Sequence, residues 1–151
     1  MDYLINYFRE NPTEWNSFKK SVEQIDNILS VNDVDEMIKN TTGNRFGKYL
    51  YKEQSINILL RHSLRGDHVA QFYLYDKLMK LAQELDGKAK VETIKSAMIF
   101  LIVSGIYGNY NDSKMNLYEM FGESKLSKLN ENKPKSCNDI MNFLAESANE
   151  T

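Results

Sequence analysis

Two histidines and one cysteine are the side chains of this sequence best suited to act as nucleophiles, general bases or soft metal ligands. His62 and His68 flank Gly66, and Cys137 lies far downstream. A zinc site needs three or four ligands at defined spacing, and nothing near the histidines supplies the rest. Cys137 follows an expected helix cap, which would lower its pKa, but no base is marked as its partner. We therefore expect surface histidines near a turn, an incidental thiol, no catalytic residue, and no metal or cofactor site.

Phosphate loops and catalytic carboxylates are also disfavoured. The segment 43–48 contains two glycines and a lysine but lacks the glycine spacing and the preceding strand of a phosphate-binding loop. Asp33, Asp35 and Glu36 are close together, yet they fall in the first turn of an expected helix. The helix dipole favours acidic side chains there, so structure explains them without a catalytic role.

Composition places the chain among folded proteins with an acidic balance. It has 151 residues, of which 21 are acidic and 19 basic, and its net charge is −2. Apolar residues make up 42%, enough to build a core, so a disordered chain is excluded. A general nucleic-acid binder would be basic, and we expect no nucleic-acid partner. The single cysteine excludes a disulfide within the chain.

The amino terminus and the apolar segments do not resemble targeting signals. The first residues, MDYLINYFRE, lack the basic start and the unbroken apolar run of a signal peptide. The longest apolar run, 97–103, has seven residues, whereas a membrane span needs about 20. We expect a cytoplasmic protein with no membrane partner, in which this run is part of a buried helix.

Apolar residues recur at helical spacing along nearly the whole chain, and no segment alternates as a strand would. The sequence predicts an all-α fold of about seven or eight helices in antiparallel pairs. We expect one helical domain over 1–151, with N-terminal capping helices in 1–42, two helix pairs in 46–122 and a C-terminal helix in 136–149. Within it, Asn32 is expected to cap a short helix, 46–65 to form a longer one, and the Lys-rich segment 125–135 to form a loop.

Two turns in the middle of the chain resemble each other. Gly66-Asp67 is followed by Ala70-Gln71 and Leu74, and 42 residues later Gly108-Asn109 is followed by Ser113 and Leu117. Glycine would supply a left-handed residue, Asp or Asn would cap the next helix, and the small residue would let helices approach closely. This pattern resembles the SEL-like repeat, a relative of the tetratricopeptide repeat, over about residues 55–121. The second unit departs from it by one inserted residue and by Ser in place of Ala.

That resemblance implies a protein-binding function, and charge suggests a surface for it. Residues 1–42 hold eight acidic and four basic side chains, so this third of the chain could steer a basic partner. Tyrosines crowd the repeat region, and tyrosine is enriched at interfaces. The candidate partner-binding residues are Asp26, Asp33, Asp35, Glu36, Tyr73 and Tyr110.

Three functions remain open at this point. A small, acidic, helical chain without catalytic motifs resembles the bacterial immunity proteins of contact-dependent growth inhibition, which implies a cognate toxin domain as its partner. The toxin's active site would be occluded, and a nuclease toxin would be basic enough to meet an acidic surface. The alternatives are a SEL-like adaptor that binds an endogenous partner in a concave groove and, with less support, a helical enzyme whose site is not recognisable.

Overall fold

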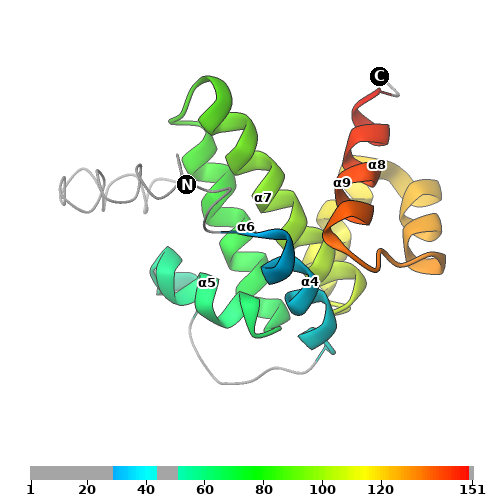
Figure 1. Ribbon diagram of the computed structural model, residues 1–151, viewed down its shortest axis with the longest axis horizontal. Coiled ribbons are helices and arrows are strands. Elements are labelled where there is room, and N and C mark those ends of the chain that lie inside the picture. The colour runs from blue at the N-terminus through cyan, green and yellow to red at the C-terminus, as the bar shows by residue number, and fades with distance from the viewer. Residues whose placement is uncertain (1–28, 44–50, 150–151) are drawn as a thin grey trace.

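The computed structural model describes residues 29–43 and 51–149, and helices are the regular structure throughout these ranges (Figure 1). The all-α prediction is therefore confirmed for this part of the chain. The expected count of seven or eight helices is not confirmed, because the helices expected before residue 29 lie outside the described residues. The described elements, in order, are α4 (Val31–Asn40), η1 (Tyr51–Glu53, a 3-10 helix), α5 (Ile56–Leu64), α6 (His68–Ala82), α7 (Gly87–Ile106), α8 (Asn111–Glu131) and α9 (Cys137–Asn149).

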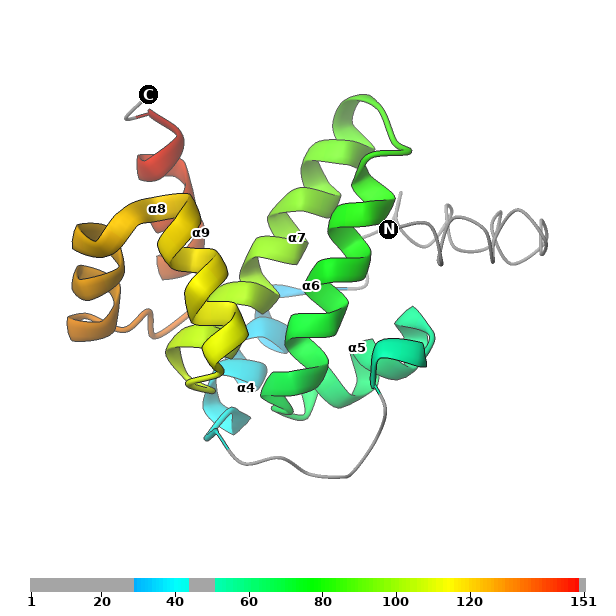
Figure 2. The same cartoon turned by 180° about the vertical axis from the view of Figure 1, so that it is seen from behind.

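The long helices α6 and α7 form an antiparallel pair through the centre of the molecule (Figures 1 and 2). The apolar run 97–103 lies in α7, and every one of its residues is buried, as expected. Figure 2 shows α6 and the first half of α8 in front, with α4 behind them. No single helix in the described ranges is long and apolar enough to cross a membrane, although α7 and α8 pass by length and composition as a pair bent by 119°.

The two similar turns are built differently. Gly66 has a φ of 101°, and a Cβ there would overlap the Asn40 carbonyl, so this position needs glycine for both reasons. In the second turn the left-handed residue is Asn109, with a φ of 55°, and not Gly108. Gly108 instead leaves room for His68, whose Cβ an alanine side chain would overlap. The residue that precedes α8 as its N-cap is Tyr110, so the expected Asn109 cap is wrong.

Two helix starts also differ from expectation. The N-cap of α4 is Ser30 and not Asn32, because Ser30 and Asp33 form a reciprocal capping box. The helix expected over 46–65 is interrupted by η1, and Ser55 begins α5 by accepting a hydrogen bond from the backbone of Ile58 at 3.3 Å. Residues 44–50, where that helix was expected to begin, lie outside the described residues.

The largest correction concerns the Lys-rich segment 125–135, which was expected to be a loop. Residues up to Glu131 are helical and form the second half of α8, beyond a kink at Gly122 with φ 85° and ψ 167°. The segment is mostly polar, but its apolar residues lie on one side of the helix. Leu126 is partly buried and Leu129 is buried against the core. Glycine permits the kink, because its φ is one that other residues rarely adopt.

Candidate functional site

The acidic residues of α4 are largely engaged in holding helices together. Asp33 accepts a hydrogen bond from the Ser30 backbone at 3.3 Å and thereby completes the capping box. Asp35 accepts one from the backbone N–H of Cys137 at 2.8 Å, so it caps the start of α9 across the molecule. Glu36 is exposed. The remaining candidate of this group, Asp26, lies outside the described residues, so the structure leaves one expected acid on a free surface.

Tyr73 and Tyr110, the two expected aromatic anchors, are brought together around one phenylalanine. The ring of Phe72 lies 5.4 Å from that of Tyr73 and 5.5 Å from that of Tyr110, and His68 approaches Tyr110 edge-on at 5.6 Å. Both tyrosines are half-buried. Tyr73 belongs to α6 and Tyr110 directly precedes α8, whereas Asp33, Asp35 and Glu36 belong to α4, which lies behind these two helices in Figure 2. The expected acids and the expected tyrosines therefore lie on different elements.

The two histidines have different environments, and the expectation of two surface side chains is wrong for His68. His68 is 8% exposed, because it begins α6 directly under the glycine turn at Gly108. His62 is half-buried, and its ring lies 5.6 Å from that of Tyr51. In the ranges that the structure describes, no group of three or more His, Cys, Asp or Glu side chains is placed to hold a metal ion.

Asp67 lies at the centre of a set of buried polar contacts at the start of α6. The sequence predicts only that this residue caps the helix. Asp67 is fully buried and accepts hydrogen bonds from the backbone of Val69 at 3.0 Å and Ala70 at 3.1 Å. The hydroxyl of Tyr51 donates a third bond to it. Three donors compensate for the loss of hydration that burial imposes on a carboxylate. The arrangement fixes η1 to α6 and leaves this acid no access to a substrate.

Further polar side chains extend this set of contacts to five helices. The Gln71 amide donates to Thr41 Oγ1 at 2.9 Å and to the Ser63 carbonyl at 3.0 Å, which links α4, α5 and α6. Ser104 donates to the His68 carbonyl at 2.7 Å and lies 2.7 Å from the Ser113 hydroxyl, which links α6, α7 and α8. We call these buried residues the polar corner: Thr41, Ser63, Asp67, Gln71, Ser104 and Ser113.

Cys137 is buried at the start of α9, and its environment opposes ionisation. Burial raises the pKa of the thiol, and the nearby charge of Asp35 raises it further. The expected lowering of the pKa by the helix terminus is therefore wrong, because burial opposes it and Asp35 already places a negative charge at that terminus. A thiol held in its protonated form is a poor nucleophile at neutral pH.

Lys77 is a buried cation that the sequence did not single out. It is 7% exposed, and its ammonium donates to the carbonyl of Gln54 just beyond η1. Burial lowers the pKa of Lys77, and repulsion from Lys80 lowers it further. Its position midway along the apolar side of α6 gave no signal, because a lysine in a helix is usually solvated.

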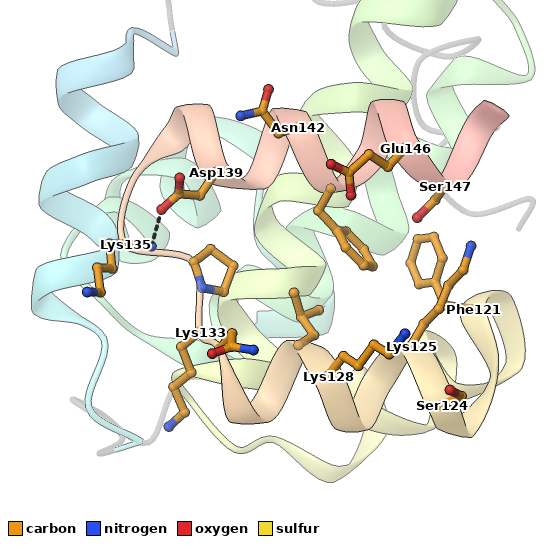
Figure 3. A pocket seen from close by; sticks show the side chains of 14 residues that line it. Phe121, Ser124, Lys125, Lys128, Lys133, Lys135, Asp139, Asn142, Glu146 and Ser147 are labelled. Atoms are coloured by element: carbon orange, nitrogen blue, oxygen red, sulfur yellow. Dashed lines mark hydrogen bonds between the residues drawn. The ribbon is translucent and has the colours of Figure 1, made fainter. Parts of the chain in front are cut away.

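One groove lies outside all of the expected site residues. It runs between the second half of α8 and α9, has a volume of about 900 Å³, and is open to solvent (Figure 3). The rings of Phe121 and Phe143 meet edge-to-face at 5.1 Å within it. Sequence reasoning missed the groove because one of its walls is the helix that was expected to be a loop.

Comparisons with known proteins add no identity to this description. No protein-family model matches the chain. No curated protein and no solved structure matches it either. The likeness of residues 55–121 to the SEL-like repeat therefore stays a prediction from the sequence.

Proposed function

We propose that this chain is a non-catalytic protein-binding domain, and that it serves as a bacterial immunity protein that binds one cognate toxin. One observation carries the proposal: in the described ranges, three of the five large apolar side chains left exposed belong to the first half of α8. They are Met115 at 62%, Tyr118 at 51% and Met120 at 42%. Exposed apolar side chains concentrated on one element favour a binding surface.

The geometry of α8 supports contact through two of these residues in particular. Met115 and Tyr118 are three residues apart, so they share one side of the helix. Tyr110, with its ring in the Phe72 cluster, stands at the start of the same helix. Tyrosine and methionine are enriched at interfaces, and a central tyrosine often dominates the binding energy.

The chemistry-bearing side chains support a non-catalytic role. Asp67 is saturated by three donors, Asp35 caps α9, and the Cys137 thiol is buried with a raised pKa. The two carboxylates thus have structural tasks, and a buried thiol in its protonated form is a poor nucleophile. A binding domain of this kind would neutralise a toxin by covering its active site.

The test is a titration with the protein encoded by the adjacent gene, combined with protection of cells that express it. Met115→Ser with Tyr118→Ser should weaken binding by tenfold or more, an effect of roughly 1.4 kcal/mol or above. Val91→Ser is the matched control, because Val91 is 51% exposed on α7. Wild-type protein that neither binds nor protects would overturn the immunity role. Equal binding by the double variant and the control would remove α8 from the interface.

A SEL-like adaptor is the second candidate, favoured by one specific observation. The matched residues of the two units, Ala70 with Ser113 and Leu74 with Leu117, are all buried at corresponding places in their helices. An adaptor would bind an endogenous partner without protecting cells from any toxin. The same titration separates the two candidates, because only the immunity role predicts both binding and protection.

A further inference from the structure

The first half of α8, which lies at the front in Figure 2, presents apolar and acidic side chains together on its solvent-facing side. Met115 is 62% exposed and Tyr118 is 51% exposed. Asp112 precedes Met115 by three residues, Glu119 follows it by four, and both acids are exposed. Residues three or four apart lie on one side of a helix, so these side chains share a surface. We call Asp112, Met115, Tyr118 and Glu119 the α8 face.

The carboxylates of the α8 face are not neutralised by the described part of the chain. Ion pairs between described residues lie within α6 and within α7, and none involves α8. The Asn116 amide donates to the backbone carbonyl of Asp112 at 2.8 Å and not to its carboxylate. Lys114, the basic residue of this half of α8, is half-buried and lies about 100° around the helix from Met115. The face therefore offers negative charge and apolar surface together.

The α8 face is held in place by the buried side of the same helix. Ser113 and Leu117 are fully buried, and Ser113 Oγ lies 2.7 Å from Ser104 Oγ of α7. Gly105 of α7 permits this close approach, because a Cβ there would lie 2.7 Å from Leu117 Cδ1. The kink at Gly122 then ends the straight part of the helix, so the face is short. A preformed surface binds with less ordering cost than one that must be assembled.

We propose that the α8 face binds a basic segment of a partner protein. Lysine or arginine side chains of the segment meet the two carboxylates, and an apolar side chain covers Met115 and Tyr118. This inference rests on the proposed protein-binding function and assigns the chemistry of the contacted segment. The hydrocarbon stems of lysine and arginine also cover apolar surface while their charged ends reach a carboxylate. Charge complementarity accelerates association and makes binding sensitive to salt, whereas the apolar contact slows dissociation.

A basic protein segment fits the α8 face better than a lipid surface or a second copy of this chain. By length and composition α7 and α8 pass as a bent membrane-spanning pair, but carboxylates on α8 oppose insertion and are repelled by anionic headgroups. A second copy that met the same face about a two-fold axis would bring the carboxylates of both copies together. Vesicles and self-association are therefore included in the test as competing outcomes.

The test measures fluorescence anisotropy with a labelled peptide of arginines around one leucine, at physiological ionic strength. Saturable binding is expected, about tenfold weaker or more after Asp112→Lys with Glu119→Lys. The matched control is Glu53→Lys with Glu84→Lys, both exposed and outside α8, which should alter affinity less than about twofold. Both double variants change the net charge equally, so a difference between them reports the position of the charges.

Two further comparisons separate charge from helix stability and from apolar contact. Asp112→Asn with Glu119→Gln removes the charges with little change in shape and should weaken binding about threefold or more. Replacing the peptide's leucine by alanine should also weaken binding, which tests the apolar part of the face without changing the protein. Circular dichroism of each variant confirms that it is folded.

The assignment is overturned by the absence of saturable binding, by equal losses in the two charge-reversed variants, or by indifference to the peptide's leucine. Equal binding of a peptide with glutamates in place of the arginines would also overturn it. So would binding to phosphatidylserine vesicles through Met115 and Tyr118, or a dimer in sedimentation that Tyr118→Ser dissociates.

The basic-segment assignment and the immunity role fail separately. A chain that protects cells but does not bind the peptide loses only the basic-segment assignment. A chain that binds the peptide through the α8 face but fails to bind or protect against the toxin loses only the immunity role.

Discussion

The polar corner and the α8–α9 end of the molecule differ in how closely their helices pack and in the surroundings of their polar groups. At the corner, helices approach so closely that Gly66 and Gly108 cannot carry a side chain, and buried hydrogen bonds join five helices. At the α8–α9 end, an aromatic pair spans an open groove, and Gly122 has open space around the position of a Cβ. Most polar groups of the corner hydrogen-bond to one another, although Ser63 Oγ and Gln71 Oε1 have no hydrogen-bond partner. The polar groups that line the groove face an opening to solvent.

In a helical chain without catalytic motifs, this difference separates residues expected to affect stability from residues expected to affect binding. Buried polar groups that hydrogen-bond to one another specify a geometry, and changing them lowers the free energy of unfolding. Charged groups around an open groove add little to stability, so substitutions there should leave the fold intact. Stability and binding should therefore be separable by substitutions at the two ends.

The largest expected effect comes from adding one methyl group at the corner. Gly66→Ala places a Cβ against the Asn40 carbonyl in a left-handed conformation and should cost about 3–5 kcal/mol of unfolding free energy. Gly122→Ala is the matched substitution at the other end, with a φ of 85° but no neighbour to overlap. It should cost about 1–3 kcal/mol from backbone strain alone, because a φ of 85° with a ψ of 167° lies in a region that is essentially confined to glycine. Urea denaturation measures both, and equal costs would contradict the contrast between the two ends.

The next effect concerns the buried carboxylate at the corner. Asp67→Ala removes a helix cap and leaves the donors of Tyr51, Val69 and Ala70 buried without an acceptor. We expect a loss of about 3 kcal/mol, made up of the cap and the unsatisfied donors. Tyr51→Phe removes only one donor and should cost about 1 kcal/mol. If Asp67→Ala proves no worse than Tyr51→Phe, the carboxylate does not organise the corner.

Ala70 provides a smaller test of the same packing. It is fully buried in the first turn of α6, which agrees with the sequence prediction for this residue. Ala70→Leu should cost about 1–3 kcal/mol by overpacking. Ala145→Leu is the control, because Ala145 is exposed on α9. A melting temperature unaffected by Ala70→Leu would contradict the close approach at this position.

The sequence predicts the corner well because its signals are local. Glycine before Asp67 predicts a helix end and a restart, and the small residue at Ala70 predicts close packing. The second turn shows the limit of this reasoning, since Gly108 is required by its neighbour His68 and not by its own backbone. Contact with a residue 40 positions away in the chain leaves no mark on the spacing of nearby residues.

The groove was hidden for a different physical reason. A helix whose outward face carries several lysines has little overall hydrophobicity, so the segment 125–135 resembled a loop. Leu126 and Leu129 were the available signal, because they recur at helical spacing within the polar run. The acids of α4 have structural partners that their spacing did not indicate: Asp33 accepts from the Ser30 backbone and Asp35 from the distant Cys137 backbone. Their expected role in partner binding stays a prediction.

The smallest expected effect is chemical and tests the link that anchors α9. Burial is the main cause of the raised pKa of Cys137, and the Asp35 charge is the second. The folded protein should therefore react with a thiol reagent at pH 8 at least about tenfold more slowly than the protein in urea, because little thiolate is present and access is limited. Asp35→Asn keeps an oxygen for the Cys137 backbone but removes the charge. It should recover only a small part of the lost rate. A return to the unfolded rate would show instead that Asp35 holds the start of α9 closed.

The same thiol gives a pH dependence of defined sign. A folded thiol with a raised pKa keeps its proton at pH values where the unfolded thiol, with an ordinary pKa of about 9, has begun to lose it. The folded state then binds more protons, so this group lowers the free energy of unfolding as the pH rises from about 8 upward. Cys137→Ala removes that contribution while Tyr75 and Tyr107, whose pKa values burial also raises, keep theirs. The loss of stability between pH 8 and pH 10, measured by urea denaturation, should therefore be smaller in Cys137→Ala than in the wild type. Parallel curves would mean that the thiol ionises equally in both states, and that α9 does not hold Cys137 away from water.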